Sequence, residues 1–409
     1  MKARPTRFPL LDSFRAIGVF CVLIGHTVGP AGALASPHLR PYATRMAFAL
    51  AIFFLLSAFL LYRPYVRARL DDKPGPSARV YFWNRFVRVA PVYWVALTIA
   101  AIWGTTAGPP VFGVRGIPTY YGFAQIYWSD TALGGISIAW FLCVLVAFYL
   151  VLPLYAALVR RTGGVDREAR LRRELLACAA LFGLSVGYQV LLELTGLRTV
   201  SPFHLLLPAW SDWLAVGMAL AVLSVWYEKR PQRPAAIGGI DRFPSLGIAL
   251  ALVGFWVVSK RIGLHGGYPG KHDHVKFLAE HQLNLVIALG LFLPVVFGDP
   301  RRGLTRRLLG NRVLVYLGVV SYGILLYHLS VIVQLKKWNF TPPVGAPSYL
   351  LWPLLTLAAA TVIATANHYW LERPLTRLRS AIGPGRSTGP GAPGVDATAA
   401  RSVATADSR

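Results

Sequence analysis

Long apolar stretches separated by short polar connections recur along the whole chain. Each stretch is close to the roughly 20 residues that an α-helix needs to cross the hydrocarbon core of a bilayer. The pattern therefore predicts an all-α polytopic membrane protein, a bundle of about ten transmembrane helices. The predicted spans cover residues 10–29, 45–62, 89–104, 138–159, 175–193, 205–226, 245–259, 282–298, 313–335 and 348–371.

The composition fits a protein that is embedded in lipid. Of the 409 residues, 55% are apolar and 14% charged, so water cannot be the solvent for most of the surface. The polar connections are too short to hold a second folded domain. Toward the C-terminus the chain turns to Gly, Pro, Ala, Ser and Thr, which is typical of disorder. We therefore predict a membrane domain at residues 1–376 and a disordered cytoplasmic tail at residues 377–409.

The net charge of +25 would suit a nucleic-acid-binding protein if the basic residues gathered on one soluble face. Instead, they are concentrated in alternate connections, those that lie on the same side of the membrane as the N-terminus. Connections on the side of the N-terminus hold 31 of the 42 Lys and Arg residues, and connections on the opposite side hold 10. The positive-inside rule then predicts that both termini are cytoplasmic. We expect a multi-pass protein of the cell membrane with the lipid bilayer as its partner and no nucleic-acid partner.

The first span carries an unusual polar stripe. Arg15 and His26 lie 11 residues apart, which on a helix is about three turns, roughly 16 Å of rise and only about 20° of rotation. They therefore share a face, with Arg15 near the cytoplasmic interface and His26 toward the outer end. Ionisable groups within spans usually mark functional sites. In the alternative interpretation Arg15 extends to the interface beside Asp12, and His26 only caps the helix.

Six segments in order resemble the signatures of one family. Asp12, Arg15 and His26 are similar to the first-span motif of the acyltransferase 3 family of membrane acyltransferases. The resemblance continues through Phe53–Leu60, Asn84–Pro91, Trp140–Pro153, Ser321–His328 and Glu372–Pro374. It thus covers residues 10 to about 376. One departure concerns the fourth-span motif, where many members have an acidic residue and this chain has Leu145 and Val146.

The resemblance implies an O-acyltransferase that moves a short acyl group, acetyl in our reading, from cytoplasmic acyl-CoA to a hydroxyl. The acceptor class that it implies is a glycan or a glycosylated small molecule of the cell envelope. Acyl-CoA is then a donor substrate, and we expect no tightly bound cofactor. Such a reaction needs a base for the acceptor hydroxyl and an anchor for the anionic donor.

Particular residues are candidates for the base and for the anchor of the donor. His26 is the candidate base, since an unperturbed histidine titrates near neutral pH. Arg15, Arg85 and Arg88 converge on the predicted cytoplasmic side, where guanidinium groups suit the phosphates of coenzyme A. Arg85 and Arg88 can equally be ordinary topology-setting charges. Whether His26 acts as a base or carries the acyl group stays open. The further site candidates are Asp12, Ser57, Asp212, Tyr322, His328 and Glu372.

Three of these further candidates have structural alternatives. Asp212 is either a site residue or the partner of an arginine that faces it from another helix. His328 fits a hydrogen bond between helices better than a reactive role. Glu372 can pair at the membrane interface with Arg373 or Arg377.

Two other groups are weaker. The outer connection contains His265, His272, Asp273, His274 and His281, and His-x-His can bind zinc. No second shell or fixed spacing accompanies these residues, so we predict no metal site. Aromatic residues crowd the outer connection before the fourth span and can form an interfacial belt or a stacking platform for a sugar ring. They are Tyr120, Tyr121, Tyr127, Trp128 and Trp140.

Two other functions remain open at this stage. In a transporter or flippase, the charged stripe of the first span would be a proton or substrate path. A catalytically inactive relative would explain Leu145 and Val146 in place of the acidic residue. The three cysteines Cys21, Cys143 and Cys178 all fall in apolar spans, and we infer helix packing rather than a disulfide.

Overall fold

A computed structural model of the chain describes residues 10–198, 202–228, 238–239, 242–262, 274–297, 303–342 and 347–382. Within these ranges the fold is helical, with a single isolated β-bridge between Ala107 and Gly135. The α-helices are α1 (Leu10–Thr27), α2 (Arg40–Ala43), α3 (Phe48–Leu70), α4 (Ala78–Ile102), α5 (Trp140–Arg161), α6 (Arg167–Leu194), α7 (Ser211–Glu228), α9 (Ser245–Val257), α10 (His274–Val296), α11 (Leu304–Leu309), α12 (Arg312–Val319), α13 (Ser321–Lys337), α14 (Ser348–Asn367) and α15 (Arg373–Ile382). Short π-helical or 3-10 segments include η1 (Ile117–Tyr121), η5 (Leu207–Trp210), η6 (Val258–Ile262) and η7 (His368–Glu372).

Eight helices of the described chain are long and apolar enough to cross a membrane. A ninth candidate span results if α12 and α13, which meet at an angle of 73°, are taken together. The sequence predicts ten. The difference lies at residues 245–259, where α9 is apolar but has only 13 residues, fewer than the roughly 20 needed for a span. The predicted multi-pass helical class is confirmed, and α9 packs lengthwise against α10.

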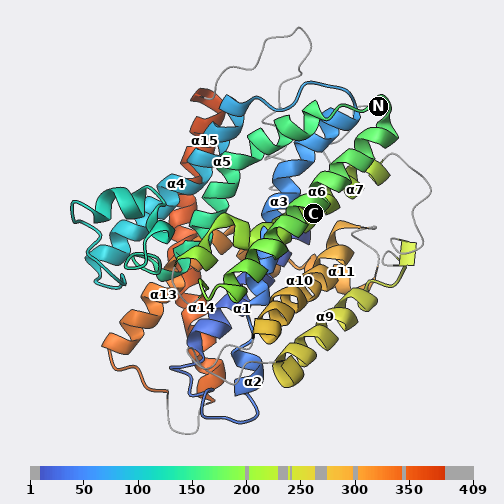
Figure 1. Cartoon of the computed structure of the whole chain (residues 1–409). Coiled ribbons are helices and arrows are strands. Elements are labelled where there is room, and N and C mark those ends of the chain that lie inside the picture. The colour runs from blue at the N-terminus through green and yellow to red at the C-terminus, as the bar shows by residue number, and fades with distance from the viewer. Residues whose placement is uncertain are drawn as a thin grey trace, which may run out of the picture.

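Helix α3 lies at the centre of the bundle (Figure 1), and most of its side chains are buried. Its main neighbour is α7. The two backbones approach closely at Gly217, where a Cβ would overlap the carbonyl group of Leu55. Small residues at such crossings are what holds helices together in lipid, where apolar side chains gain little by leaving the solvent.

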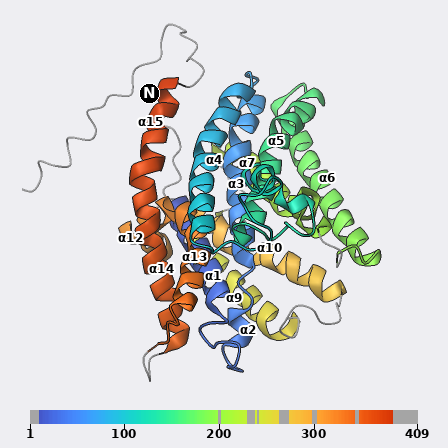
Figure 2. The same ribbon diagram turned by 90° about the vertical axis from the view of Figure 1, so that its left-hand side faces the viewer.

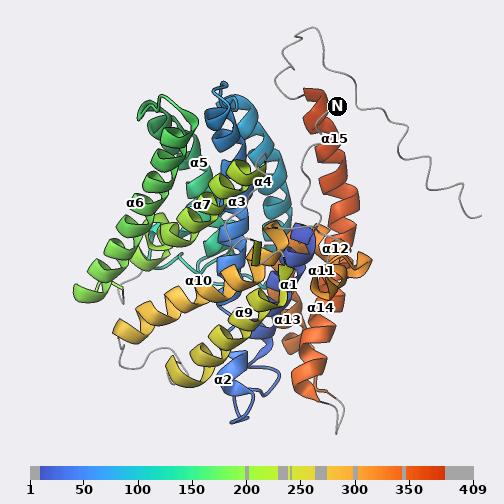
Figure 3. The same cartoon turned by 90° about the vertical axis from the view of Figure 1, so that its right-hand side faces the viewer.

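The two flanks of the bundle are formed by different helices. Helices α14 and α15 follow one another through η7 as a long rod along one flank, and α6 stands on the opposite flank (Figures 2 and 3). Helix α6 exposes Leu176, Leu184 and Leu191. An outward leucine face of this kind suits contact with lipid chains rather than with water.

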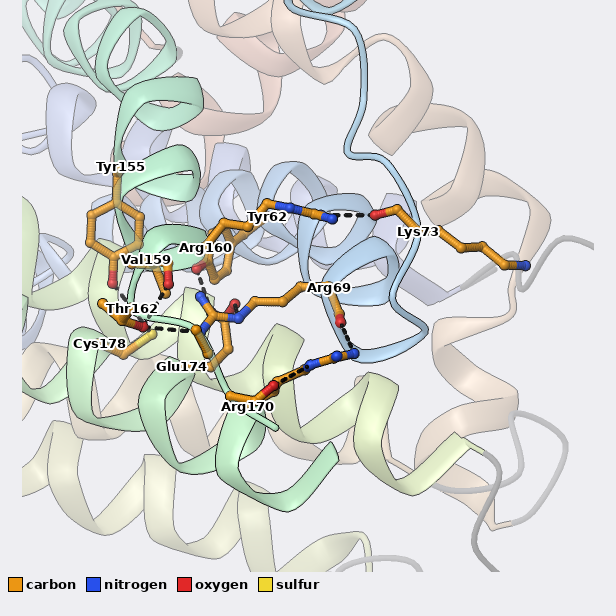
Figure 4. A network of polar contacts seen from close by, with 12 residues as sticks. Tyr62, Arg69, Lys73, Tyr155, Val159, Arg160, Thr162, Arg170, Glu174 and Cys178 are labelled. Carbon is orange, nitrogen blue, oxygen red and sulfur yellow. Dashed lines mark hydrogen bonds and ion pairs between the residues drawn. The ribbon is translucent and has the colours of Figure 1, made fainter. Parts of the chain in front are cut away.

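The turn between α3 and α4 and the turn between α5 and α6 lie at the same end of the molecule (Figure 1), which we call the basic end. A buried polar cluster ties α3, α5 and α6 together there (Figure 4). The hydroxyl of Tyr62 donates to Glu174, and Nε of Arg69 lies 3.4 Å from the same carboxylate. Arg69 also donates to Oγ1 of Thr162 at 3.1 Å. All three members of the Tyr62–Arg69–Glu174 group are at most 5% exposed.

Replacing Glu174 by Leu should therefore destabilise the protein. The change leaves the Arg69 guanidinium buried without its counter-charge, and breaking a buried pair in this way costs about 3–5 kcal/mol. Thermal unfolding of the purified protein in detergent measures the effect. The control is Asp130→Asn, which breaks the exposed pair between Arg115 and Asp130 and should cost at most about 1 kcal/mol. An unchanged unfolding temperature for Glu174→Leu would contradict the proposed role of the cluster.

Candidate functional site

A cavity of about 470 Å³ lies between α1, α3, α4, α5, the junction of α12 with α13, and η7. This volume falls within the range of about 300–1,000 Å³ that is usual for small-molecule sites. One part of its wall is polar, formed by Asp12, Arg15, Ser57, Arg85, Arg88, Tyr149, Ser321, Tyr322, His368, Glu372 and Thr376. The remainder is apolar and includes Phe53, Leu56, Leu60, Phe141, Leu142, Leu145 and Leu325. The cavity is therefore amphipathic.

Three arginines meet in the polar part of the wall. Arg15 and Asp12 form an ion pair with an N–O distance of 2.5 Å, one turn apart on α1. Arg85 and Arg88 stand in the third turn of α4, and Arg88 lies near enough to Arg15 for their charges to repel. Arg88 is exposed and has no hydrogen-bond or ion-pair partner within the part of the chain that the structure describes. The site thus holds a cation that the protein itself does not neutralise.

The junction of α12 and α13 supplies one side of the cavity. Gly318 lies against α1 so closely that a Cβ would overlap the carbonyl oxygen of Asp12. Oγ of Ser321 donates to the carbonyl oxygen of Gly318 at 2.8 Å and so ties the two helix ends together. A broken helix at membrane depth is tolerated where it is buried in protein or borders a cavity, because the freed backbone groups then find partners.

Four of the sequence-predicted site residues besides the arginines also line this cavity: Asp12, Ser57, Tyr322 and Glu372. The hydroxyl of Tyr322 donates to the carbonyl oxygen of Val89 at 3.0 Å, which joins α13 to α4. Glu372 lies 2.7 Å from Nδ1 of His368, one turn away. The sequence suggested Arg373 or Arg377 as its partner. The guanidinium of Arg373 instead lies over the ring of Tyr369, 4.6 Å from its centre.

His26 and His328 form a pair at the other end of α1. Nδ1 of His26 lies 2.8 Å from Nε2 of His328, and the two rings are nearly parallel, at 19°. The side chain of His26 is exposed, whereas that of His328 is 1% exposed. His328 therefore makes the hydrogen bond between helices that the sequence suggested. The contact of His26 is with His328 and not with the end of its own helix, where Oγ1 of Thr27 donates to the carbonyl oxygens of Leu23 and Ile24.

The His26–His328 pair and the cavity are adjacent along α13. The side chain of Leu325 lines the cavity, and its carbonyl oxygen lies 2.8 Å from Nδ1 of His328, one turn farther along the helix. On α1, Arg15 lines the cavity and His26 follows three turns later. The pair therefore lies beyond the end of the cavity that is remote from Arg15.

Asp212 belongs to a different cluster, away from the cavity wall. Its carboxylate lies 2.9 Å from Nε2 of His281 and accepts from the amide of Gln282 at 2.8 Å, and the ring of Trp213 stacks on His281 at 4.3 Å. The partner of Asp212 is thus a histidine and a glutamine rather than an arginine. The sequence placed His281 in a solvated outer loop, but it lies in α10 and is 5% exposed, because Asp212 needs a buried partner.

The other histidines of that connection lie outside the described part of the chain or have side chains that it does not cover. Among the described residues no group of three or more histidine, cysteine or acidic side chains is arranged to hold a metal ion. His281 is taken up by Asp212 and Gln189.

The outer aromatic residues do not form one surface. Tyr120 is fully buried, and the hydroxyl of Tyr121 hydrogen-bonds with Thr98 at 2.6 Å. Burial, helped by the nearby charge of Asp130, raises the pKa of Tyr120. Tyr127 and Trp128 alone of the five are exposed, and Trp128 lies beside the guanidinium of Arg115. A continuous platform is therefore excluded for this set, and a two-residue contact remains.

Three further residues, which were not among the candidates predicted from the sequence, also line the cavity: Tyr149, His368 and Thr376. Tyr149 hydrogen-bonds with Ser57 and lies near all three arginines. Its position inside the fourth-span motif was the available signal. His368 and Glu372 are four residues apart, a spacing that places side chains on one helix face. No sequence feature marked Thr376 as a residue that lines the cavity.

Comparison with known proteins gives one family match. Residues 8–367 match the family model of acyltransferase 3, described as an acyltransferase domain. No curated protein and no solved structure matched the chain.

Proposed function

Because the chain belongs to the acyltransferase 3 family, which makes it a membrane-bound acyltransferase, we propose that it transfers an acetyl group from acyl-CoA to a hydroxyl of a glycan or a glycosylated small molecule. One observation carries the proposal. The cavity holds three arginines, of which Arg88 has no partner among the described residues, and Leu325 of its wall lies one helical turn from His328. His328 in turn contacts Nδ1 of His26, whose Nε2 has no partner among the described residues. An anionic thioester donor and a base are what acyl transfer to a hydroxyl requires.

The arginine cluster suits the phosphates of coenzyme A. Arg88 offers a guanidinium without a protein partner, and Arg85 stands less than one turn away on the same helix. Guanidinium groups bind phosphate oxygens through two parallel hydrogen bonds, which gives both charge and direction. The apolar wall formed by Phe53, Phe141 and Leu142 then suits the pantetheine arm and a short acyl group. The volume of the cavity suits the pantetheine arm of acyl-CoA better than the whole acyl-CoA molecule.

His26 is the proposed base. It stands past the end of the cavity, so a thioester that reaches through the cavity would meet it there. Where many family members have an acidic residue in the fourth span, this chain has Leu145 and Val146, and Leu145, which is 4% exposed, forms part of the apolar wall. Asp12 and Glu372, the carboxylates of the wall, already pair with Arg15 and His368. A histidine base that works without a carboxylate is therefore the simplest assignment for this chain.

The acceptor class rests on the resemblance to the family. The exposed rings of Tyr127 and Trp128, with Arg115 and Asp130 beside them, support it, because sugar rings stack on aromatic faces and bond to charged groups at their edges. These residues lie in the connection between α4 and α5, which joins the ends of these two helices that are remote from the basic end. Donor and acceptor would thus approach the His26–His328 pair from opposite sides.

The proposal requires the basic end to face the cytoplasm, where acyl-CoA is found. Single cysteines in a background without Cys21, Cys143 and Cys178 test this orientation. Ser77→Cys lies at the basic end and Ala35→Cys in the connection after α1, both exposed. A membrane-impermeant maleimide added to intact cells should label Ala35→Cys and spare Ser77→Cys until the cells are opened. Labelling of Ser77→Cys in intact cells would reverse the proposed direction of transfer.

Replacing Arg88 by Ala should weaken acyl-CoA binding by about 10- to 100-fold, because hydrogen bonds to charged groups contribute about 1.5–3 kcal/mol. Arg88→Lys should recover part of the affinity, since it keeps the charge and loses the paired hydrogen bonds. Calorimetry on the purified protein measures binding.

Arg79→Ala is the matched control for this donor-binding test. Arg79 is an exposed arginine of the same helix that does not line the cavity. An equal loss of affinity in Arg79→Ala would mean that the overall field of α4 is responsible and would remove Arg88 from the donor site.

His26→Gln should lower kcat by about 10²- to 10⁴-fold, the usual contribution of a positioned general base, and leave acyl-CoA binding unchanged. Glutamine has a similar reach and hydrogen-bonding capacity but takes up no proton near neutral pH. Release of coenzyme A and formation of the ester are measured together. His38→Gln, an exposed histidine of the connection after α1, is the control and should keep normal turnover. Near-normal turnover of His26→Gln would exclude His26 as the base.

A further inference from the structure

The proposed base has a partner whose own protonation is dictated by the backbone of α13. Nδ1 of His328 lies 2.8 Å from the carbonyl oxygen of Leu325 and 3.3 Å from that of Ile324. A carbonyl oxygen can only accept a hydrogen bond. Nδ1 of His328 therefore carries a proton, because two lone pairs at 2.8 Å would repel each other.

The second nitrogen of His328 follows from its surroundings. The side chain is 1% exposed, and no carboxylate contacts it within the described residues. An imidazolium at this position would be a buried cation without a counter-charge, which is strongly unfavourable. His328 is thus neutral, with its proton on Nδ1 and a lone pair on Nε2.

This arrangement fixes the tautomer of His26 in turn. Nε2 of His328 lies 2.8 Å from Nδ1 of His26, and since Nε2 holds the lone pair, Nδ1 of His26 must donate. The lone pair of His26 then resides on Nε2. No described residue hydrogen-bonds with that nitrogen, and the side chain of His26 is the exposed member of the pair. The nitrogen that can take a proton is thus the one without a hydrogen-bond partner among the described residues.

We propose that His328 is the positioning residue of the reaction: it holds His26 with its proton on Nδ1 and its lone pair on Nε2, directed at the acceptor. This inference rests on the proposed function. In the step, the acceptor hydroxyl gives its proton to Nε2 of His26 while its oxygen bonds to the thioester carbonyl carbon. The carbon–sulfur bond then breaks, the acyl group stays on the acceptor, and the proton passes from Nε2 to the leaving thiolate of coenzyme A.

His328 also stabilises the cation that forms on the way. Once His26 holds two protons, its Nδ1–H donates from a charged ring to a neutral nitrogen, and charge-assisted hydrogen bonds of this kind are roughly twice as strong as neutral ones. The pair therefore uses a second imidazole where other histidine bases use a carboxylate. The chain of contacts runs from Leu325, which lines the donor cavity, through His328 to His26.

Two substitutions at one position separate this role from simple packing. His328→Gln keeps an amide oxygen at about the reach of Nε2, which can accept from Nδ1 of His26. His328→Leu is apolar and accepts nothing. The proposal expects His328→Leu to lose at least about 10-fold in kcat, toward the about 10²- to 10⁴-fold of a lost base, and His328→Gln to lose clearly less. The KM for acyl-CoA should stay unchanged in both.

A purely structural role predicts the reverse order, because leucine suits a buried position better than glutamine does. Near-normal kcat in folded His328→Leu overturns the proposal, as does an equal loss in the two variants. Failure of this inference can be distinguished from failure of the proposed function. If wild-type protein transfers no acyl group, or if His26→Gln is active, the proposed function fails. If His26 is essential and His328→Leu is normal, only the role of His328 fails.

A measurement on the unmodified pair covers the case in which the His328 variants do not fold. Protein labelled with ¹⁵N-histidine reports, through the nitrogen chemical shifts, which ring nitrogen carries the proton. The signals of His26 are those that vanish in His26→Gln. The proposal expects His26 protonated on Nδ1 in the resting protein, and protonation on Nε2 alone would overturn it.

Discussion

The arrangement of this protein depends on one constraint, that every polar group at membrane depth must find a partner inside the protein or border a cavity. The junction of α12 and α13 meets it by turning its backbone toward the cavity and tying Ser321 to Gly318. The close approach of Gly318 to Asp12 then fixes α1 against this junction. Arg15 is thereby directed into the cavity, and His26, three turns on, is directed at His328. The positions of the site residues thus depend on how the junction of α12 and α13 packs against α1.

The sequence predicted the helical class, the approximate spans and most of the polar cavity wall, because each depends on residue type and spacing along one helix. Arg15, Arg85, Arg88 and Tyr322 come from three helices, yet the family motifs named all of them. Partners across helices were not predictable in the same way. Asp212 could be seen to need one, but its choice of His281 depends on the contact between α7 and α10. The short length of α9, 13 residues, was likewise not predictable from hydropathy, because hydropathy measures how apolar a segment is and not where its helix ends.

Leu145 illustrates how a departure from a motif acquires meaning only in the structure. From the sequence it raised the possibility of an inactive relative. In the fold it is part of the apolar wall beside Phe141 and Leu142, and the carboxylates of the wall are already paired with Arg15 and His368. An acid at this position would face the arginines and compete with an anionic donor for them. An apolar residue here leaves the cavity more positive, as the proposed site for an anionic donor requires.

The polar residues whose partners lie within the fold differ in this respect from those to which the proposed function assigns a role. Glu174 is bound by Tyr62 and Arg69, and Asp212 by His281 and Gln282, so each has used its hydrogen-bonding capacity within the fold. Both are deeply buried, and burial alone would have marked them as sites. Arg88 and Nε2 of His26, in contrast, lack partners among the described residues although each stands where one is needed. Both groups are exposed and have no partner in the described part of the fold, so they are accessible to the donor and acceptor that the proposed function requires.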